Sequence, residues 1–345
     1  MKQFVAWRLR SLLAAGSRWR PPRSETNRVL AILAGGIGDK LMDLPAVQYL
    51  RQEFPEKELT LVVIGAVPPF FAAQADHLIQ VDVKKPSLLH RTALRGFDTV
   101  FVNSIGVFDV HCELAAFLSG SRDLRGPRFA NVSERRTVYT RSYIFDQGHE
   151  TVINLRGAGG HTTEDRVPYR LTFPDDPLPP GTIPPDVIFH PGSSATGLTN
   201  RWPAEHYASL AQALHKAGYS VLAIGTPGEA ALLAELQTLS HGALQTRTDL
   251  GMESLARLLA RARLVVANDS GIGHLAAAVG APLITIMGAN RPEKVAPVGP
   301  LVTIIGPRCE FGGCYNNPAI PQCLLCIKRI APEEVVPVAL TKLIT

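Results

Sequence analysis

Short, fully apolar runs alternate with segments of helical periodicity along most of this chain. The first run, residues 29–33, is closed by a pair of glycines, and apolar residues then recur at helical spacing over residues 41–50. Further apolar runs follow at residues 59–64 and 99–102. Apolar runs of this length predict strands buried on both faces, and their alternation with helices predicts a parallel sheet with right-handed crossovers.

The same alternation restarts after a stretch, residues 173–186, that contains six prolines and predicts a stiff linker. Strands are predicted after it at residues 187–189, 219–224, 264–267 and 283–287, and helices at residues 205–217, 229–239 and 274–279. Two sheets of this kind would place ligands beyond the carboxyl ends of their strands.

We therefore expect an α/β protein with two Rossmann-like, doubly wound domains that face a cleft. Their expected bounds are residues 27–174 and 187–330, joined by a proline-rich linker at residues 175–186. A basic arm, residues 1–26, precedes them. Residues 331–345 predict a C-terminal helix, which we expect to pack back on the first domain.

Composition agrees with a folded two-domain protein. The chain has 345 residues, of which 46% are hydrophobic and 19% charged, and it contains no apolar run of about 18 residues that would predict a membrane-spanning helix. With five cysteines and no convincing signal peptide, we expect a cytoplasmic protein. The net charge of +5 suits anionic partners and does not require nucleic acid, which we do not expect as a partner.

Basic and aromatic side chains are mixed in the N-terminal arm. Arginines there stand beside Trp7 and Trp19, with Glu25 as the only acid. This mixture is typical of segments that lie on an anionic inner-membrane surface, but it is equally compatible with a soluble basic arm. Peripheral membrane contact and a free arm both stay open.

The first candidate site follows the first strand. Gly36 and Gly38 flank a turn that opens a helix, where free backbone amides favour an anion and glycine allows close approach. Asp39 then has two interpretations, as a helix cap or as a carboxylate for chemistry. The turn does not fit G-x-G-x-x-G, so a nicotinamide dehydrogenase is not expected.

Two more candidate loops lie in the second half of the chain. Ser193 and Ser194 follow a strand, and the guanidinium of Arg201, just beyond, suits a phosphate. The third loop, residues 268–274, leads from a strand into an alanine-rich helix. Amides and hydroxyls at this positive helix end suit a diphosphate, and His274 either faces that ligand or is a hydrogen-bonded structural histidine.

In this order the three loops resemble glycosyltransferase family 9, the lipopolysaccharide heptosyltransferases. The resemblance covers roughly residues 28–340 and rests on Gly36-Ile37-Gly38-Asp39 with Leu44-Pro45-Ala46, Pro191-Gly192-Ser193 with Arg201-Trp202-Pro203, Gly225-Thr226-Pro227-Gly228-Glu229, and residues 268–282. It implies a GT-B fold, a nucleotide-sugar donor and an inverting displacement that requires no metal or other cofactor.

The resemblance also implies roles for single residues. Asp39 matches the general base, and Glu229 matches an acid that binds the ribose. Gly36 and Gly38 lie on the acceptor side, near the phosphates. The donor is expected to contact Ser193, Ser194, Asp269, Ser270, Gly271, His274 and Gly288. Acceptor contacts are expected from residues 104–111 and 156–166, with His161 and Arg166 as guesses.

One position departs from the family pattern. Before Arg201-Trp202-Pro203 the family usually has a lysine that neutralises the diphosphate, and this chain has Asn200. Arg201 or Arg291 is expected to supply the missing charge.

Three functions stay open. The leading one transfers heptose from ADP-heptose to a lipopolysaccharide-core-like or other saccharide or lipid-linked acceptor. A second keeps the fold with another nucleotide sugar or acceptor, and a third is a non-catalytic nucleotide-sugar-binding protein.

Four cysteines cluster near the end of the chain, at Cys309, Cys314, Cys323 and Cys326. Four nearby thiols, two of them in a Cys-x2-Cys pair, suit a structural zinc or iron ion. They are also compatible with plain reduced thiols, or with disulfides if the protein meets an oxidant.

If the cysteines hold a structural metal, protein purified under reducing conditions will contain about one equivalent of zinc or iron, because thiolates bind these ions tightly. Elemental analysis measures this content, with Cys112→Ser as the matched control that keeps all four clustered thiols. A reduced preparation without stoichiometric zinc or iron would rule the metal out.

Overall fold

The computed structural model describes residues 25–85, 94–103, 109–128, 137–144, 148–171, 184–193, 200–306 and 325–344, together with Leu89 and Leu178. The chain forms two compact units, unit 1 comprising Met1–Val167 and unit 2 comprising Pro168–Thr345. Residues 1–24 of the expected N-terminal arm and most of the expected linker lie outside the described residues. Within the described part of the chain, no helix is long and apolar enough to cross a membrane.

Unit 1 contains one parallel sheet of six strands in the order β3-β2-β1-β4-β5-β6. The strands are β1 (Arg28–Leu33), β2 (Glu58–Ile64), β3 (His77–Val81), β4 (Thr99–Asn103), β5 (Asp123–Arg128) and β6 (Arg141–Ile144). The helices are α2 (Ile37–Met42), α3 (Leu44–Glu53), the 3-10 helix η1 (Pro69–Gln74), α4 (Asp109–Leu118) and α5 (Glu150–Ala158).

Unit 2 repeats this topology, with a parallel sheet in the order β12-β11-β10-β7-β8-β9. Its strands are β7 (Val187–His190), β8 (Val221–Ile224), β9 (Gln245–Arg247), β10 (Leu264–Asn268), β11 (Leu283–Ile286) and β12 (Val302–Ile305). Its helices are α6 (Ala204–Lys216), η6 (Pro227–Glu229), α7 (Ala230–Leu239), α8 (Met252–Arg261), α9 (Gly271–Ala278), α10 (Pro292–Val295), α11 (Leu325–Lys328) and α12 (Pro332–Ile344).

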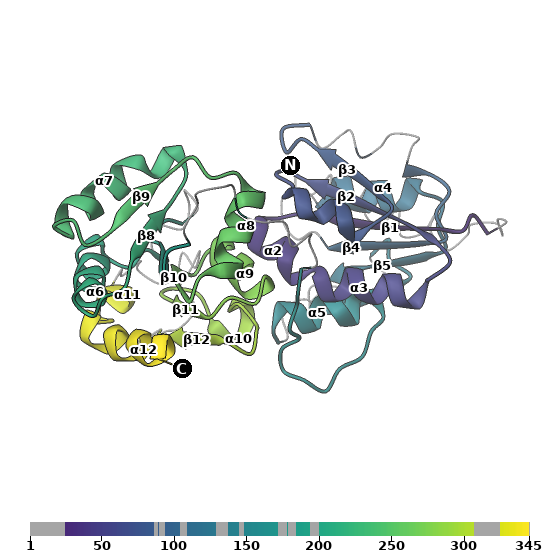
Figure 1. Ribbon diagram of the computed structural model, residues 1–345. Helices are drawn as coiled ribbons and strands as arrows, with labels where there is room; N and C mark the ends of the chain where they lie inside the picture. The colour runs from purple at the N-terminus through teal and green to yellow at the C-terminus, as the bar shows by residue number, and fades with distance from the viewer. Residues whose placement is uncertain are drawn as a thin grey trace, which may run out of the picture. The chain divides into compact units, whose positions relative to one another are not determined.

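Helices cover both faces of each sheet (Figure 1). In unit 1, alternate residues of β1 such as Leu30 and Ile32 pack with α4, while α3 and α5 pack together on the other face. In unit 2, Val187 and Phe189 of β7 pack with α6, α7 and α12. Apart from Arg28 at the start of β1, the central strands β1, β7 and β10 are buried along their length, which explains their continuous apolar runs in the sequence. The expected doubly wound fold is confirmed in both units.

In each unit the strand order reverses between two central strands, β1 and β4 in unit 1 and β7 and β10 in unit 2. Loops at the carboxyl ends of such a strand pair diverge and leave room for a ligand. The Gly36–Asp39 turn follows β1, Ser193 follows β7, and the loop that starts at Asn268 follows β10. The topology therefore places all three predicted loops at the two positions where this fold binds ligands.

The C-terminal helix corrects one expectation. Val335, Ala339 and Leu343 of α12 are buried in the same core cluster as α6 of unit 2, and α12 contacts α6 along its length. These residues recur every four positions and so form one apolar face. The helix packs on unit 2 because this face belongs to the unit 2 core, whereas we expected it on the first domain.

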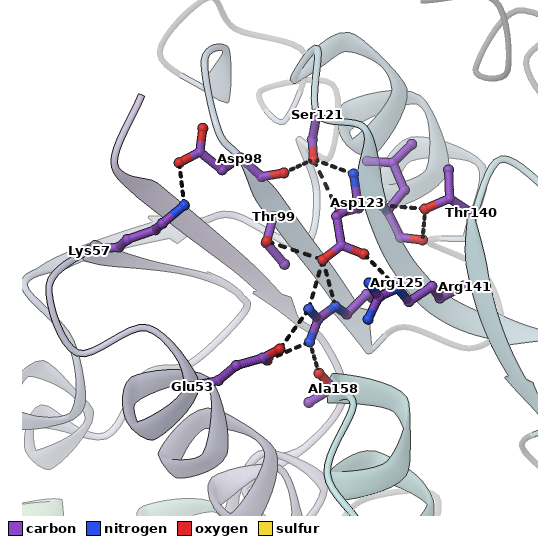
Figure 2. Close-up of polar contacts among 11 residues, drawn as sticks. Glu53, Lys57, Asp98, Thr99, Ser121, Asp123, Arg125, Thr140, Arg141 and Ala158 are labelled. Atoms are coloured by element: carbon purple, nitrogen blue, oxygen red, sulfur yellow. Dashed lines mark hydrogen bonds and ion pairs between the residues drawn. The ribbon is translucent and has the colours of Figure 1, made fainter. Parts of the chain in front are cut away.

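A buried arginine anchors the opposite, amino-terminal side of the unit 1 sheet (Figure 2). Arg125 on β5 donates to Glu53 Oε2 at 2.7 Å, to Asp123 Oδ2 at 2.7 Å and to the carbonyl oxygen of Ala158. Its side chain is only 2% exposed. Arg125 thus ties α3, β5 and the end of α5 together, and its place away from the strand carboxyl ends gives it a structural role.

Replacing Arg125 by alanine should lower the free energy of unfolding of unit 1 by about 3 kcal/mol, because two half-buried carboxylates and a carbonyl lose their partner. Urea unfolding followed by circular dichroism measures the change. Arg141→Ala is the control, since this guanidinium is 65% exposed at 3.3 Å from the same Asp123 and should matter by about 0.5 kcal/mol or less. Equal effects of the two substitutions would contradict the assignment.

Candidate functional site

A single buried amide organises the candidate donor site of unit 2. Asn268 ends β10, has no exposed surface, and donates from Nδ2 to the carbonyl oxygens of Pro191 at 2.7 Å and Gly192 at 3.2 Å. Its Oδ1 accepts from the Trp202 N–H at 3.1 Å and the Tyr207 hydroxyl at 3.0 Å. All four hydrogen-bonding positions of the amide are used, so the loops after β7 and β10 are held in one arrangement.

The loop after β10 leads directly into α9 through Ser270, which has extended backbone geometry at the helix N-cap. The N–H groups of the first turn, Gly271 to Gly273, have no carbonyl partner within the helix. They point toward the N-terminal side of α9, where the helix dipole adds partial positive charge. This turn has the chemistry of an anion site, as predicted for Ser270 and Gly271.

Two histidines flank Ser270. His190 Nδ1 lies 3.1 Å from the Ser270 hydroxyl, and burial lowers the pKa of His190 to about 4, so this ring is neutral at pH 7. His274, on the first turn of α9, is 4% exposed and pairs through Nδ1 with the Tyr169 hydroxyl at 2.7 Å. The interpretation of His274 as a hydrogen-bonded histidine is therefore confirmed for Nδ1.

Asp269 is held by two side-chain amides. Asn290 Nδ2 donates to its Oδ2 at 2.5 Å, and Asn200 Nδ2 lies 3.5 Å from the same oxygen. Asn200 Oδ1 also accepts from the Ala289 N–H at 3.2 Å. Asn200 occupies the position where the family usually has lysine. It is buried and joins two loops through neutral hydrogen bonds, close to the buried Gly288.

Arg201 lies against the loop after β7. Its Nε donates to Ser193 Oγ at 3.0 Å and its Nη2 to the Ser193 carbonyl oxygen at 3.1 Å. The charge of Arg201 also lowers the pKa of His190, after the larger effect of burial. Arg291 is 60% exposed and lies 3.6 Å from Glu293. Of the two cations considered for the missing lysine, the described contacts place Arg201 among the donor loops.

Glu229 reaches the same strand end from the loop after β8. Its Oε2 accepts from the Thr226 N–H at 2.8 Å and the Thr226 hydroxyl at 2.9 Å. A Cβ at Gly192 would collide with the Glu229 carboxylate, so any larger residue there would require Glu229 to move. The carboxylate therefore lies against the backbone after β7, and its charge favours the protonated form of His190. The structure brings Glu229, Ser193, Arg201, Asp269 and Ser270 together at one edge of the sheet.

Asp39 lies at the equivalent edge of unit 1. Its Oδ2 accepts from the Gly36 N–H at 2.6 Å, so it does cap the short helix α2, and its side chain is exposed. Gly35 has φ +99°, and a Cβ there would meet Asp39 Oδ2 at 2.5 Å. Gly36 and Gly38 lie in the same turn. The cap interpretation is confirmed, and it does not exclude chemistry, because a carboxylate has a second oxygen.

A buried carboxyl group, which the sequence did not single out, lies one helical turn after Asp39. Asp43 has no exposed surface, and its Oδ1 accepts from the side-chain amides of Asn103 and Asn154, the latter at 2.8 Å. Its Oδ2 has no hydrogen-bond partner within the described part of the chain. Burial raises the pKa of Asp43 well above its ordinary value, and the nearby charge of Asp39 raises it further.

Lys40 lies beside these acids and is almost fully buried. Its Nζ donates to the Ala66 carbonyl oxygen at 2.9 Å, and burial lowers its pKa while Asp39 and Asp43 oppose that shift. The turn after β1 thus carries three ionisable groups, of which only Asp39 is exposed.

Some predicted residues lie outside the described part of the chain, namely Ser194, Cys309, Cys314 and Cys323. Cys326, the last of the cluster, is described and buried. Within the described residues no group of three or more His, Cys, Asp or Glu side chains is arranged to hold a metal. The sequence did not single out Asn290 or Tyr169, which contact Asp269 and His274, because neither carries a local signal. His190 belongs to the loop of residues 190–194 that the sequence did single out.

Replacing Asp43 by asparagine keeps the Oδ1 acceptor and removes the titration. A raised pKa means that the folded wild type binds this proton more tightly than the unfolded chain. Its stabilising effect is complete below about pH 4 and is lost as the pH rises through the folded pKa. The free energy of unfolding of Asp43→Asn, relative to wild type, should therefore increase from pH 4 to pH 8, measured by urea unfolding.

Asp43→Ala is the control, because it removes the same titration but leaves two buried amides without an acceptor. We expect it to be less stable than Asp43→Asn by about 1–3 kcal/mol at every pH. A difference between wild type and Asp43→Asn that stays constant with pH would refute a buried, proton-binding Asp43.

Known proteins resemble this chain in sequence and in fold. Residues 168–318 match the profile of glycosyltransferase family 9 (heptosyltransferase). Lipopolysaccharide heptosyltransferase 1 of Escherichia coli K12 is 34% identical over 300 residues, which cover 79% of this chain and 91% of that protein. Lipooligosaccharide heptosyltransferase 2 of Haemophilus influenzae is 35% identical over 126 residues, so that this match spans only about a third of the relative's length (36%) and 35% of this chain.

Among solved structures, the Escherichia coli ADP-heptose lipopolysaccharide heptosyltransferase II superposes with a TM-score of 0.69 at 21% identity, covering 92% of this chain and 98% of that one. This likeness supports the GT-B fold, whose two parallel six-stranded sheets are described above. The near full-length relation to heptosyltransferase 1, together with the profile match, shows that this chain belongs to glycosyltransferase family 9.

Proposed function

We propose that this protein is an inverting glycosyltransferase that moves heptose from ADP-heptose to a saccharide acceptor of the lipopolysaccharide-core type. The observation that carries the proposal is the donor-type site of unit 2, where Asn268 fixes two loops around the N-terminus of α9. Relatives named as heptosyltransferases support the choice of sugar. The acceptor is a saccharide or a lipid-linked saccharide.

Unit 2 would hold the nucleotide sugar. The N–H groups of Gly271 to Gly273 and the Ser270 hydroxyl suit the oxygens of the diphosphate, and Arg201 suits the negative charge that grows on it. Glu229 would accept hydrogen bonds from the ribose hydroxyls. Asp269, oriented by Asn290 and Asn200, would accept a hydrogen bond from the sugar.

Unit 1 would supply the base. In one displacement, Asp39 takes the proton of the acceptor hydroxyl as that oxygen attacks the anomeric carbon. The bond between the anomeric carbon and the phosphate oxygen breaks, and the nucleoside diphosphate leaves with the electron pair. The protein needs no cofactor for this step. The geometry of the cap, with Oδ2 on the Gly36 N–H, would leave the other oxygen for the proton.

Further parts of the proposal concern residues outside the described ranges. The clustered cysteines would hold a structural zinc or iron ion, remote from the chemistry. The basic arm at the N-terminus would let a cytoplasmic enzyme rest on the inner membrane where a lipid-linked acceptor lies. Nucleic acid is not a proposed partner.

Asp39→Asn should lower kcat by about 10²- to 10⁴-fold, because the amide cannot accept the proton. It should keep the affinity for ADP and the folded structure, since its Oδ1 still accepts from the Gly36 N–H. Release of nucleoside diphosphate from a panel of nucleotide sugars, with a lipopolysaccharide-core acceptor, measures the rate, and circular dichroism checks folding.

Asp82→Asn is the control, since this exposed carboxylate caps a turn by accepting from the Lys84 N–H and should leave the rate unchanged. Turnover only with a nucleotide sugar other than ADP-heptose would favour the second function, in which the same fold uses a different donor. Binding without turnover, unchanged by Asp39→Asn, would overturn the enzyme and leave a nucleotide-sugar-binding protein.

A further inference from the structure

His190 and Ser270 meet at the candidate donor site from the ends of two neighbouring strands. His190 is the last residue of β7, Ser270 follows the end of β10, and the two strands pair in parallel with Ala267 opposite His190. The side chains lie with His190 Nδ1 3.1 Å from Ser270 Oγ. His190 is 6% exposed and Ser270 is partly exposed, so the serine is the member of the pair that a ligand can reach.

The side chain of Ser270 does not do what a serine at a helix N-cap usually does. Such a serine normally turns its oxygen back to accept from an N–H group of the first helical turn. Ser270 makes no such bond, and within the described part of the chain its Oγ contacts the His190 ring instead. The serine therefore does not use up the first-turn N–H groups of α9, and its hydroxyl is oriented by the histidine.

The backbone on the histidine side of this pair is fixed by other contacts. The carbonyl oxygen of His190 accepts from the Tyr207 hydroxyl at 3.4 Å, and the next two carbonyl oxygens along the chain accept from Asn268 Nδ2 at 2.7 Å and 3.2 Å. The ring and the serine hydroxyl are thus held at hydrogen-bond distance. What remains to be decided is which of the two donates.

A hydrogen bond between a neutral histidine and a serine has two possible directions. Either the hydroxyl donates to an unprotonated Nδ1, or Nδ1–H donates to Oγ and leaves the hydroxyl proton for another acceptor. Burial lowers the pKa of His190 to about 4; the charge of Glu229 opposes this shift and that of Arg201 adds to it. The ring is therefore neutral at pH 7, and the direction depends on which nitrogen carries its one proton.

A bound diphosphate is compatible with only one of these directions. The diphosphate of a nucleotide sugar is ionised, so its oxygens accept hydrogen bonds and donate none. If Ser270 gave its proton to Nδ1, only oxygen lone pairs would face the anion. If Nδ1–H donates to Oγ, the hydroxyl proton can form a charge-assisted hydrogen bond with a diphosphate oxygen. Contact between this hydroxyl and the diphosphate therefore requires a protonated Nδ1.

We infer that His190 is a positioning residue which, in its Nδ1–H tautomer, donates to Ser270 Oγ and so directs the Ser270 hydroxyl proton to a diphosphate oxygen of the nucleotide sugar. The inference rests on the function proposed above, which supplies the diphosphate. The two hydrogen bonds reinforce each other, because a hydroxyl that accepts a hydrogen bond is a better donor. Their effect grows as the diphosphate gains charge on leaving.

The direct test reads the protonation of the ring nitrogens in protein labelled with ¹⁵N-histidine. The measurement is made with ADP at pH 8, well above the second pKa of a phosphate monoester at about 6. His190 should then show a protonated Nδ1 and an unprotonated Nε2, with its signals assigned by their loss in His190→Asn. An unprotonated Nδ1 in the ADP complex would overturn the inference.

Adenosine is the matched control ligand, because it lacks the diphosphate. It should leave the His190 signals as they are in the free protein. A shift of His190 to the Nδ1–H form with adenosine alone would mean that the diphosphate does not select this tautomer, and would also overturn the inference.

The second readout is ADP affinity, measured by calorimetry. His190→Leu removes the ring nitrogen and should weaken ADP binding by about threefold to tenfold, as expected for one hydrogen bond. His190→Asn places an N–H₂ group as many bonds from the backbone as Nδ1, so it should recover most of the lost affinity.

A double-mutant cycle with Ser270→Ala separates positioning from packing. In the Ser270→Ala background, His190→Leu should have no further effect on ADP affinity, because the hydroxyl that His190 orients is gone. An undiminished loss in that background would mean that His190 acts through packing, and would overturn the inference.

These readouts distinguish failure of the inference from failure of the proposed function. If the wild type binds neither ADP nor another nucleoside diphosphate, the proposed function fails and the inference fails with it. If ADP binds but Nδ1 stays unprotonated, only the positioning role of His190 fails and the glycosyltransferase proposal is untouched.

Discussion

The candidate donor site of unit 2 depends on the side-chain amide of Asn268. Its four hydrogen bonds join the backbone after β7, the Trp202 N–H and the Tyr207 hydroxyl, and none of these groups is exposed to replace a lost bond with water. Two loops that follow different strands thereby become one rigid surface. An anion site made of backbone N–H groups needs this rigidity, since the groups bind well only when they converge without reorganisation.

Near these two loops, contacts with other residues orient the polar side chains of the candidate site. Side-chain amides, one of them from Asn290, hydrogen-bond Asp269, and Arg201 donates to the Ser193 hydroxyl. The Tyr169 hydroxyl pairs with His274, and the missing side chain at Gly192 leaves space for the Glu229 carboxylate. The departure at Asn200 fits the same pattern. An asparagine there lacks the charge of a lysine but bridges Asp269 and the Ala289 N–H, and Arg201 is a cation that contacts the loop after β7.

In unit 1 the two acids Asp39 and Asp43 differ in burial. Asp39 is exposed and needs only the Gly36 N–H, whereas Asp43 is buried one turn later and favours the protonated state. Two carboxylates so close would repel if both were ionised. Burial of Asp43 favours its neutral form and so avoids this repulsion. The two interpretations of Asp39, cap and base, are therefore compatible, because each uses a different oxygen.

The sequence by itself determined the fold class, the central strands and the three loops, because strands buried on both faces must be continuously apolar and the loops must begin where they end. It missed β3, β5, β6, β9 and β12, which lie toward the sheet edges and are partly exposed or, in β5, interrupted by Gly126 and Pro127. The packing of α12 on unit 2 and the contact of Tyr169 with His274 could be seen only in the folded protein. These pairings join residues far apart in the chain, and no local pattern records which distant partner completes a buried hydrogen bond or apolar face.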